Sequence, residues 1–269
     1  MQRKILIYNS QTENSILTKR ILSEKLLAKH FSIVDKLDDE VELLVCIGGD
    51  GTFLDAIHEF SFPDIPIIGI NTGHLGFFQE IMPDKLDEFI NNYLNQKYSI
   101  QSMQTVKALV YHDNICETFT GLNEIVIASA ANYAYSVHFD ISIGGSFIER
   151  FSGDGLLIST PAGSTAYNYS LGGSIVDPRL KLLQATPIAP MNTTAYRSFT
   201  SSILLPPDMN MGIKPVDNSS KVKITVAFDG FNKIFDNVRN IEVSLSETNV
   251  KLLRFESYDF WSKVKSKFL

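Results

Sequence analysis

The stretch LLVCIGGDGT at residues 43–52 decides the fold of the amino-terminal part of the chain. Its first five residues form a continuous apolar run, which is typical of a strand buried on both faces of a parallel sheet. The glycines let the backbone turn tightly, and residues 53–60 then have the pattern of a helix. Backbone N–H groups and the positive end of a helix meet at such a turn, which favours an anion, typically a phosphate.

The segments on either side repeat this alternation of strand and helix. We predict further strands at residues 5–8, 31–34 and 65–70 and a helix at residues 84–93. Ser10-Gln11-Thr12-Glu13 fits a capping box, and the helix behind it has one apolar face, made by Leu17, Ile21, Leu22 and Leu26. Residues 1–101 are therefore expected to form a doubly wound α/β lobe.

The pattern changes after about residue 101. Residues 106–111, 124–128, 137–143 and 221–228 favour β-branched side chains, and Gly144-Gly145 between two such runs predicts a hairpin. We therefore expect a β-rich second lobe over residues 102–254. In the tail, residues 255–269, the spacing of Phe260, Trp261, Val264 and Phe268 suits a short amphipathic helix that packs onto a lobe.

Composition excludes several classes of protein. The chain has 269 residues, of which 44% are hydrophobic and 20% charged, as in an ordinary globular protein. It lacks an apolar stretch of about 20 residues, so we expect no membrane span. Its net charge is −6 without a basic stripe, which argues against nucleic acid as a partner. Cys46 and Cys116 form neither a disulfide framework nor a zinc motif, and without an export signal we expect a cytoplasmic protein.

The glycine loop does not match the common nucleotide motifs. The sequence contains no Gly-Lys pair, so it has no GxxxxGK[ST] loop, and a GxGxxG pattern beginning at Gly49 fails at Leu54. It also has no GxSxG elbow and no HExxH motif. Asp50 is unusual in a phosphate loop, because a carboxylate repels phosphate. A carboxylate at this position is suited to orient a hydroxyl or to share a metal ion with phosphates.

The second half contributes three further polar constellations. Asn123-Glu124 opens a predicted strand, although by itself this pair is more typical of a turn cap than of a ligand site. Gly153-Asp154-Gly155 repeats the Gly-Asp-Gly pattern of the first loop. The segment STPAGSTAYNYS at residues 159–170 is dense in hydroxyls and carries two tyrosines between apolar flanks, which favours a polar pocket with a stacking face.

Taken in this order, the motifs resemble those of the NAD kinase family. The resemblance includes the segment NTGHLGF at residues 71–77 and the carboxyl-terminal Arg254-Phe255 and Phe260-Trp261, so it covers nearly the whole chain. GGDGT alone is shared with lipid kinases, whereas TPAGSTAY at residues 160–167 makes the assignment specific. The family transfers the γ-phosphate of ATP, or in some members of polyphosphate, to the adenosine ribose 2′-hydroxyl of NAD, with Mg²⁺ accompanying the phosphates.

The resemblance implies that the tail, residues 255–269, returns to the first lobe, and it implies a role for each matching position. Asp50 would be the proton acceptor and Gly51 would lie against the substrate, in a phosphate loop completed by Gly48, Gly49 and Thr52. Asn123 and Glu124 would hold the adenosine ribose. The rest of the NAD pocket would comprise Thr165, Ala166, Tyr167, Asn168, Tyr169 and Ser170, with Tyr167 covering the adenine.

Asp154 and Ala189 would contact the nicotinamide side, beside a neighbouring subunit of a homodimer or homotetramer. Ser152 is also expected in the NAD pocket, at a position where relatives often have a basic residue that touches the dinucleotide. Gly230 stands where some relatives have a larger polar residue. The motifs contain no Lys or Arg, so we expect a divalent cation that arrives with ATP and no metal site made by the protein alone.

Two other functions remain open on the sequence. A lipid kinase would share GGDGT, although the chain shows no basic amphipathic helix or lipid anchor. A dinucleotide sensor without catalysis would keep the pocket, but it would have no need of Asp50.

Overall fold

The computed structural model describes residues 3–130, 136–193, 197–216 and 223–268. The chain divides into two compact units: a first unit of Met1–Met103 with Asn249–Leu269, and a second unit of Gln104–Thr248. The boundaries differ from the predicted divisions at residues 101 and 254 because β17 (Val238–Arg254) is one unbroken strand that begins in the second unit and ends in the first. No break in the sequence pattern marks that crossing.

The first unit is built on a parallel sheet. Strand β1 (Lys4–Asn9) lies between β2 (Ser32–Val34) and β3 (Val41–Gly48), and β3 pairs with β4 (Pro66–Asn71). The far side of β4 pairs with β5 (Gln79–Ile81) and with the end of β17, where Lys251 lies opposite Pro66. The helical elements are α1 (Glu13–Ala28), α2 (Asp50–Glu59), a 3-10 turn η1 (Pro83–Lys85), α3 (Leu86–Leu94) and α5 (Phe260–Phe268).

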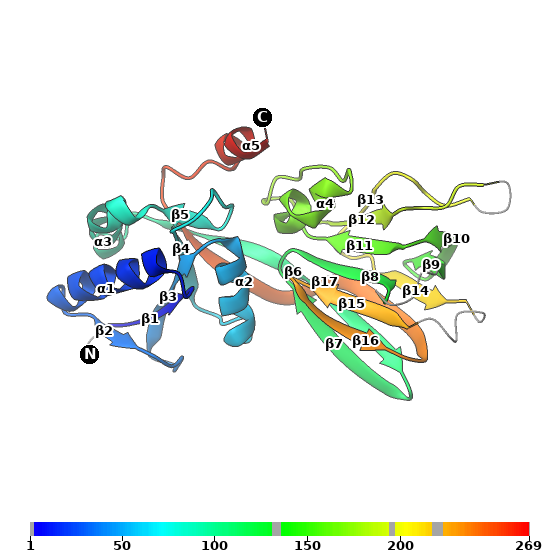
Figure 1. Cartoon of the computed structure of the whole chain (residues 1–269), viewed down its shortest axis with the longest axis horizontal. Helices are drawn as coiled ribbons and strands as arrows, with labels where there is room; N and C mark the ends of the chain where they lie inside the picture. Colours follow the sequence, from blue (N-terminus) through cyan, green and yellow to red (C-terminus); the bar gives the residue numbers. More distant parts are fainter. Residues whose placement is uncertain (1–2, 131–135, 194–196, 217–222, 269) are drawn as a thin grey trace. The chain divides into compact units, whose positions relative to one another are not determined.

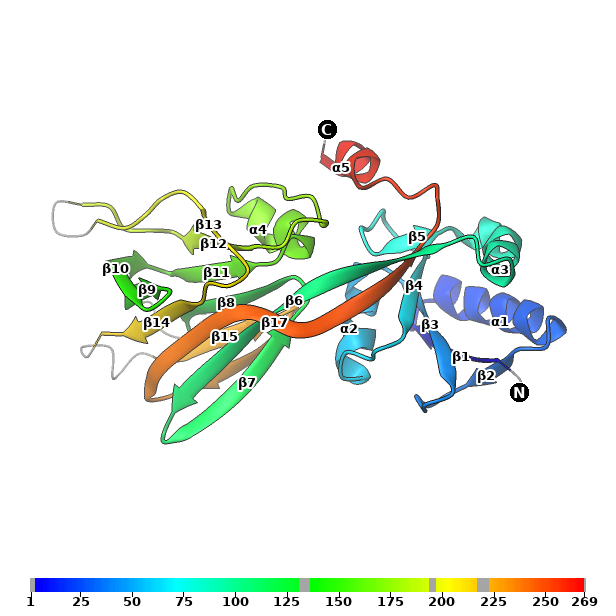
Figure 2. The same cartoon turned by 180° about the vertical axis from the view of Figure 1, so that it is seen from behind.

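Helices cover this sheet on both faces, as the continuous apolar strands require. Alternate residues of one strand point to opposite faces, and in β3 both Leu43 and Leu44 are fully buried. One core joins Leu43 to Leu22 of α1 and Phe89 of α3, while α2 covers the other face. Figures 1 and 2 show α1 and α3 together on one side of the sheet and α2 on the other. The predicted doubly wound α/β lobe is confirmed.

Two details of the predicted first helix are wrong. Thr12, rather than Ser10, is the N-cap, and its side chain accepts a hydrogen bond from the Ser15 backbone N–H. The buried face is made by Ser15, Thr18, Leu22 and Leu26, whereas Leu17 is 56% exposed. The sequence misleads here because α1 is apolar on more than one side, and a small hydroxyl residue can pack as closely as a leucine.

The second unit is a β-sandwich, which confirms the predicted β-rich lobe. One layer has the order β10-β9-β14-β17, with β6 beside β17 and β7 beside β6, and the other has the order β13-β12-β11-β8-β15-β16. The bounds are β6 (Ser99–His112), β7 (Ile115–Gly121), β8 (Glu124–Ser129), β9 (Val137–Ile143), β10 (Ser146–Gly153), β11 (Gly155–Ser159), β12 (Leu183–Ile188), β13 (Ile203–Leu205), β14 (Met211–Pro215), β15 (Ile224–Phe228) and β16 (Phe231–Phe235). A 3-10 turn η2 (Ala162–Thr165) and the single turn α4 (Tyr167–Ser170) follow β11.

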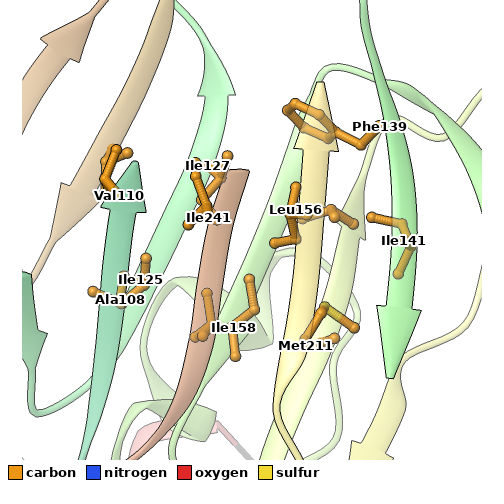
Figure 3. Packing of buried hydrophobic residues seen from close by; sticks show 14 of the residues in the cluster. Ala108, Val110, Ile125, Ile127, Phe139, Ile141, Leu156, Ile158, Met211 and Ile241 are labelled. Atoms are coloured by element: carbon orange, nitrogen blue, oxygen red, sulfur yellow. The ribbon is translucent and has the colours of Figure 1, made fainter. Parts of the chain in front are cut away.

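The core of this unit is filled by aliphatic side chains from both layers. Ile127 and Ile158 come from one layer and Ile141 and Ile241 from the other, and all four are fully buried. Figure 3 shows these side chains pointing toward one another between the strands. This packing fixes β8 and β11, whose ends carry the polar motifs of this half.

Tight turns close two of the hairpins. Gly144 and Gly145 both have positive φ, 55° and 81°, and join β9 to β10 as predicted. Asp229 and Gly230 also have positive φ, 48° and 93°, and join β15 to β16. Of the strand predicted at residues 221–228, the first two residues lie outside the described residues, and the strand is described from Ile224. Leu269 of the predicted tail also lies outside them.

Across the described parts of the chain, no helix is long and apolar enough to cross a membrane.

Candidate active site

The glycine loop occupies the turn from β3 into α2. Gly49 is the N-cap of α2 in an extended conformation, and no side chain caps the helix start. The first backbone N–H groups of this helix are therefore donors for an anion. A Cβ on Gly48 would lie 2.2 Å from the Thr52 hydroxyl oxygen, whereas a Cβ on Gly51 would meet open space. Gly48 is thus needed for packing, and Gly51 keeps the approach to the loop clear.

The Asp50 carboxylate is held in place by two backbone amides. Its Oδ2 accepts from the Phe77 N–H at 2.9 Å and its Oδ1 from the Phe78 N–H at 3.0 Å. A Cβ on Gly76 would lie 2.2 Å from Oδ1, so only glycine leaves room for the carboxylate there. The side chain is half-buried and cannot rotate freely. Each oxygen keeps a further lone pair for a substrate hydroxyl or a cation.

The loop after β4 supplies those amides. Because β3 and β4 are parallel neighbours, their carboxyl ends meet at one edge of the sheet, where ligands bind in such folds. The Asn71 side chain accepts from the Gly73 N–H at 3.0 Å, and the Gln79 amide donates to the Gly49 carbonyl at 2.6 Å. The NTGHLGF segment and the glycine loop are thus tied into one structure within the first unit.

In the second unit, Asn123 and Glu124 stand at the start of β8 on a rigid backbone. The Asp229 carboxylate accepts from the N–H groups of Leu122 and Asn123 at 2.6 and 2.7 Å. The Thr160 hydroxyl donates to the Leu122 carbonyl at 2.6 Å, and the Thr160 N–H donates to the Asn123 carbonyl at 2.9 Å. The side chains of Asn123 and Glu124 are almost fully buried, at 7% and 8% exposure.

These two side chains carry acceptors without a partner. Within the described residues, Oδ1 of Asn123 and Oε2 of Glu124 are buried and have no hydrogen-bond partner. Burial raises the pKa of Glu124 to about 8, and the negative charge of Asp229 adds to the rise. Unpaired buried acceptors are costly to a fold, so adjacent ones indicate a place for a ligand that brings hydroxyl donors.

The TPAGSTAY segment packs directly on this pair. A Cβ on Gly163 would lie 2.1 Å from the Asn123 carbonyl oxygen, so glycine is required for the close approach. Ser164 and Thr165 are buried, whereas Tyr167 and Tyr169 in α4 are 45% and 40% exposed. The two tyrosine rings therefore have surface available for a flat ligand. Ala166 directly precedes Tyr167 in the chain, and Ser170 directly follows Tyr169.

Two residues of the predicted NAD pocket, Asn168 and Ser152, form hydrogen bonds within the protein. Asn168 is fully buried, its amide faces the carbonyls of Ser164 and Ser174, and its oxygen accepts from Thr186. Ser152 is also fully buried, with its hydroxyl 2.8 Å from the His138 ring and its N–H donating to Ser198. Neither side chain reaches the surface in this structure.

Asp154 and Ala189 lie together at the opposite end of β11 from Glu124. Asp154 is exposed and its N–H donates to the Ile188 carbonyl, next to Ala189. Glu124 instead pairs with Ser159 at the other end of the strand. Five residue steps separate Asp154 from Ser159, which is roughly 17 Å of extended chain.

Three residues that organise these sites are not predicted from the sequence. Asp229 is followed by Gly230, and an Asp-Gly pair is typical of an ordinary turn such as the one between these paired strands. Gln79 and Lys263 lie outside every motif. Their roles depend on contacts with distant backbone groups, which leave no local pattern.

Comparison with known proteins agrees with this geometry. Residues 5–98 match the model of the ATP-NAD kinase N-terminal domain, and residues 122–255 match that of the ATP-NAD kinase C-terminal domain. The chain is 38% identical to the NAD kinase of Finegoldia magna, over 98% of this chain and 97% of that protein. It is 34% identical to NAD kinase 1 of Halalkalibacterium halodurans, over 86% of this chain and 87% of that protein.

Two solved structures share the fold at low sequence identity. A yeast NADH kinase complexed with NADH is similar with a TM-score of 0.85 and 18% identity, covering 99% of this chain and 87% of that one. An NAD kinase from Archaeoglobus fulgidus in complex with ATP gives a TM-score of 0.76 at 22% identity, covering 98% of this chain and 99% of the other. With both of its domains matched and close relatives along nearly its full length, the chain belongs to the ATP-NAD kinase family and is an NAD kinase.

Proposed function

We propose that this enzyme transfers the γ-phosphate of ATP, or of polyphosphate, to the adenosine ribose 2′-hydroxyl of NAD, with Asp50 as the acceptor of the hydroxyl proton. The observation that carries the proposal is the Asp50 carboxylate, fixed by two backbone amides at the start of a helix whose first N–H groups suit a phosphate. Phosphoryl transfer needs positioning more than strong basicity, so a fixed Asp is sufficient.

NAD is proposed to lie along β11 of the second unit. The unpaired acceptors of Asn123 and Glu124 would take up hydrogen bonds from the adenosine ribose hydroxyls, and Tyr167 would cover the adenine. Asp154 and Ala189, at the other end of the strand, would contact the nicotinamide side. An extended dinucleotide can reach both ends, and the unpaired acceptors of Asn123 and Glu124 support placing the ribose hydroxyls at their end. Thr165, Ala166, Tyr169 and Ser170 would complete the pocket, with Asn168 and Ser152 supporting it from behind.

We propose that the reaction uses a divalent cation, Mg²⁺, bound mainly by the phosphates of ATP. The residues present are compatible with a cation bound in this way. Among the described residues, no three His, Cys, Asp or Glu side chains gather as a metal site. Asp50 can still offer a lone pair, and magnesium typically uses one or two carboxylates together with phosphate oxygens. When bound, the cation would neutralise phosphate charge, while Asp50 and the helix amides hold the reacting groups.

A homodimer or homotetramer in the cytoplasm is proposed as the working form. Phe147 on β10 is 65% exposed, and Ile148 beside it is also exposed, so the second unit presents apolar surface suited to a neighbouring subunit. Both cysteines are free thiols, and Cys116 is exposed, which suits a reducing compartment.

The decisive experiment is a direct assay. The protein is incubated with NAD, ATP and Mg²⁺, and NADP is measured with an NADP-specific dehydrogenase. Formation of NADP supports the proposal. Tight binding of NAD without any NADP would indicate a sensor, and phosphorylation of a lipid would indicate the other kinase class.

A further inference from the structure

Lys263 reaches from the carboxyl-terminal helix α5 to the loop that holds Asp50. Its ammonium donates to the carbonyl oxygens of Gly76 at 3.1 Å and Phe77 at 3.4 Å, and also to the carbonyl oxygen of Gln79. A single charged group therefore binds three carbonyl oxygens of one short turn.

The carbonyls of Gly76 and Phe77 belong to the same two peptide units whose N–H groups bind Asp50. The Gly76 carbonyl shares a peptide plane with the Phe77 N–H, and the Phe77 carbonyl shares one with the Phe78 N–H. In a trans peptide the C=O and N–H point in opposite directions. Lys263 and Asp50 therefore bind the same two peptides from opposite sides. Lys263 donates to their carbonyl oxygens, and Asp50 accepts from their N–H groups.

Side-chain packing fixes the turn in the same orientation. The Phe77 ring lies 5.7 Å from the Phe260 ring and 5.9 Å from the Phe268 ring, both on α5. The next side chain, Phe78, points the other way and stacks on Phe53 of α2 at 4.8 Å. The turn therefore joins α5 to the helix that begins with Asp50.

The environment of Lys263 is costly for a cation. Burial lowers the pKa of Lys263 to about 8, and Arg254 lowers it further, while Glu80 and Asp50 act in the opposite direction. A lysine that only anchored a helix could keep its ammonium in water, as amphipathic side chains usually do. Here the charge is placed where it polarises two amides toward one carboxylate.

We propose that Lys263 is a positioning residue for Asp50: by fixing and polarising the Gly76–Phe77 and Phe77–Phe78 peptides, it sets the orientation of the carboxylate that receives the substrate proton. The inference rests on the proposed role of Asp50. It makes the carboxyl-terminal helix part of the phosphoryl-transfer machinery, although Lys263 touches no substrate.

The test compares Lys263→Met with Lys265→Met in the full-length enzyme. Lys265 is exposed on the same helix, so its replacement removes the same charge without touching the turn. Lys263→Met should lower kcat by about 10²-fold, the cost of a misplacement near 1 Å, and leave the KM for NAD unchanged. The backbone amides of Phe77 and Phe78 should exchange hydrogen faster in Lys263→Met and at the normal rate in Lys265→Met.

Lys263→Arg is the control that separates a loss of positioning from simple unfolding. It keeps a cation with several donors and should recover part of the lost kcat. If Lys263→Met and Lys263→Arg lost kcat and melting temperature to the same extent, Lys263 would be structural only and the proposal would be overturned.

A combination with Asp50→Asn separates the two hypotheses. If Asp50→Asn already removes the proton acceptor, adding Lys263→Met should lower kcat no further. Normal turnover of Asp50→Asn would refute the role of Asp50 itself. A large loss in Asp50→Asn with normal turnover in Lys263→Met would refute only the inference about Lys263.

Discussion

At the scale of single residues, one substitution tests both the proposed catalytic role of Asp50 and its hydrogen bonds to the backbone. Asp50→Asn removes the proposed proton acceptor, so kcat should fall by about 10² to 10⁴-fold. It also turns an amide group toward the N–H of Phe77 or Phe78, so unfolding free energy should fall by roughly 1–3 kcal/mol. Both are measured on the purified variant, as turnover per folded molecule and as melting temperature.

Asp55→Asn is the matched control for that variant, because Asp55 is exposed on the same helix. It should change neither quantity. An Asp50→Asn enzyme that lost stability but kept near-normal turnover would make Asp50 a structural residue.

Glu124 gives the second residue-scale prediction, through pH. Its pKa in the folded protein, about 8, lies above the ordinary value of 4.5, so the folded state holds this proton more tightly than the unfolded state. The stability from this group is complete below about pH 4.5 and is lost as pH rises through 8, by up to about 1.4 kcal/mol per pH unit. Glu124→Gln should therefore gain stability relative to the parent between pH 5 and 8 in paired denaturation curves.

The same pKa predicts proton release when NAD binds. A hydroxyl that donates to the carboxylate favours its charged form, so binding near pH 7.5 should release a proton. Calorimetry in buffers of different ionisation enthalpy measures this, and Glu24→Gln, an exposed change on α1, should behave as the parent. Equal proton release by the parent and Glu124→Gln would exclude Glu124 from the ribose site.

At the scale of elements, we expect the turn after β11 to position the proposed adenosine pocket through Thr160. Thr160→Val removes the hydroxyl that donates to the Leu122 carbonyl and accepts from the Gly163 N–H, while the shape is kept. The KM for NAD should rise more than kcat falls, and unfolding free energy should drop by roughly 1–3 kcal/mol. Thr160→Ser keeps the hydroxyl and should restore both, so equal behaviour of the two variants would speak against this role.

Elements with a local signal were predictable, and those that depend on distant contacts were not. Strand β3 and the Gly144-Gly145 turn follow from an apolar run and from glycines that tolerate positive φ. The buried face of α1 could not be read correctly, because exposed Leu17 and buried Leu22 look alike in a pattern. The proposed role of α5 has no local sequence signal either, because Lys263 lies among other lysines and only the fold brings it to the Gly76 turn.

At the scale of the whole molecule, the question is what neutralises the phosphates. The chain carries a net charge of −6, and no Lys or Arg lies within the glycine loop. The Lys263 ammonium lies at the loop that holds Asp50, but it donates its hydrogen bonds to backbone carbonyls. Within the glycine loop the donors for phosphate are therefore helix amides and not side-chain cations, so a divalent cation should be indispensable for turnover.

Chelation tests this with three readouts on one sample. Excess chelator should abolish NADP formation, and added Mg²⁺ should restore it. Melting temperature should not change, because within the described residues no cluster of three metal-ligating side chains is present to couple a metal to folding. NAD affinity should also persist, since the proposed pocket along β11 would use Asn123, Glu124 and Tyr167 and not a metal. Full turnover in chelator would show that amides and side-chain cations suffice, and a fall in melting temperature would reveal a metal bound by the protein itself.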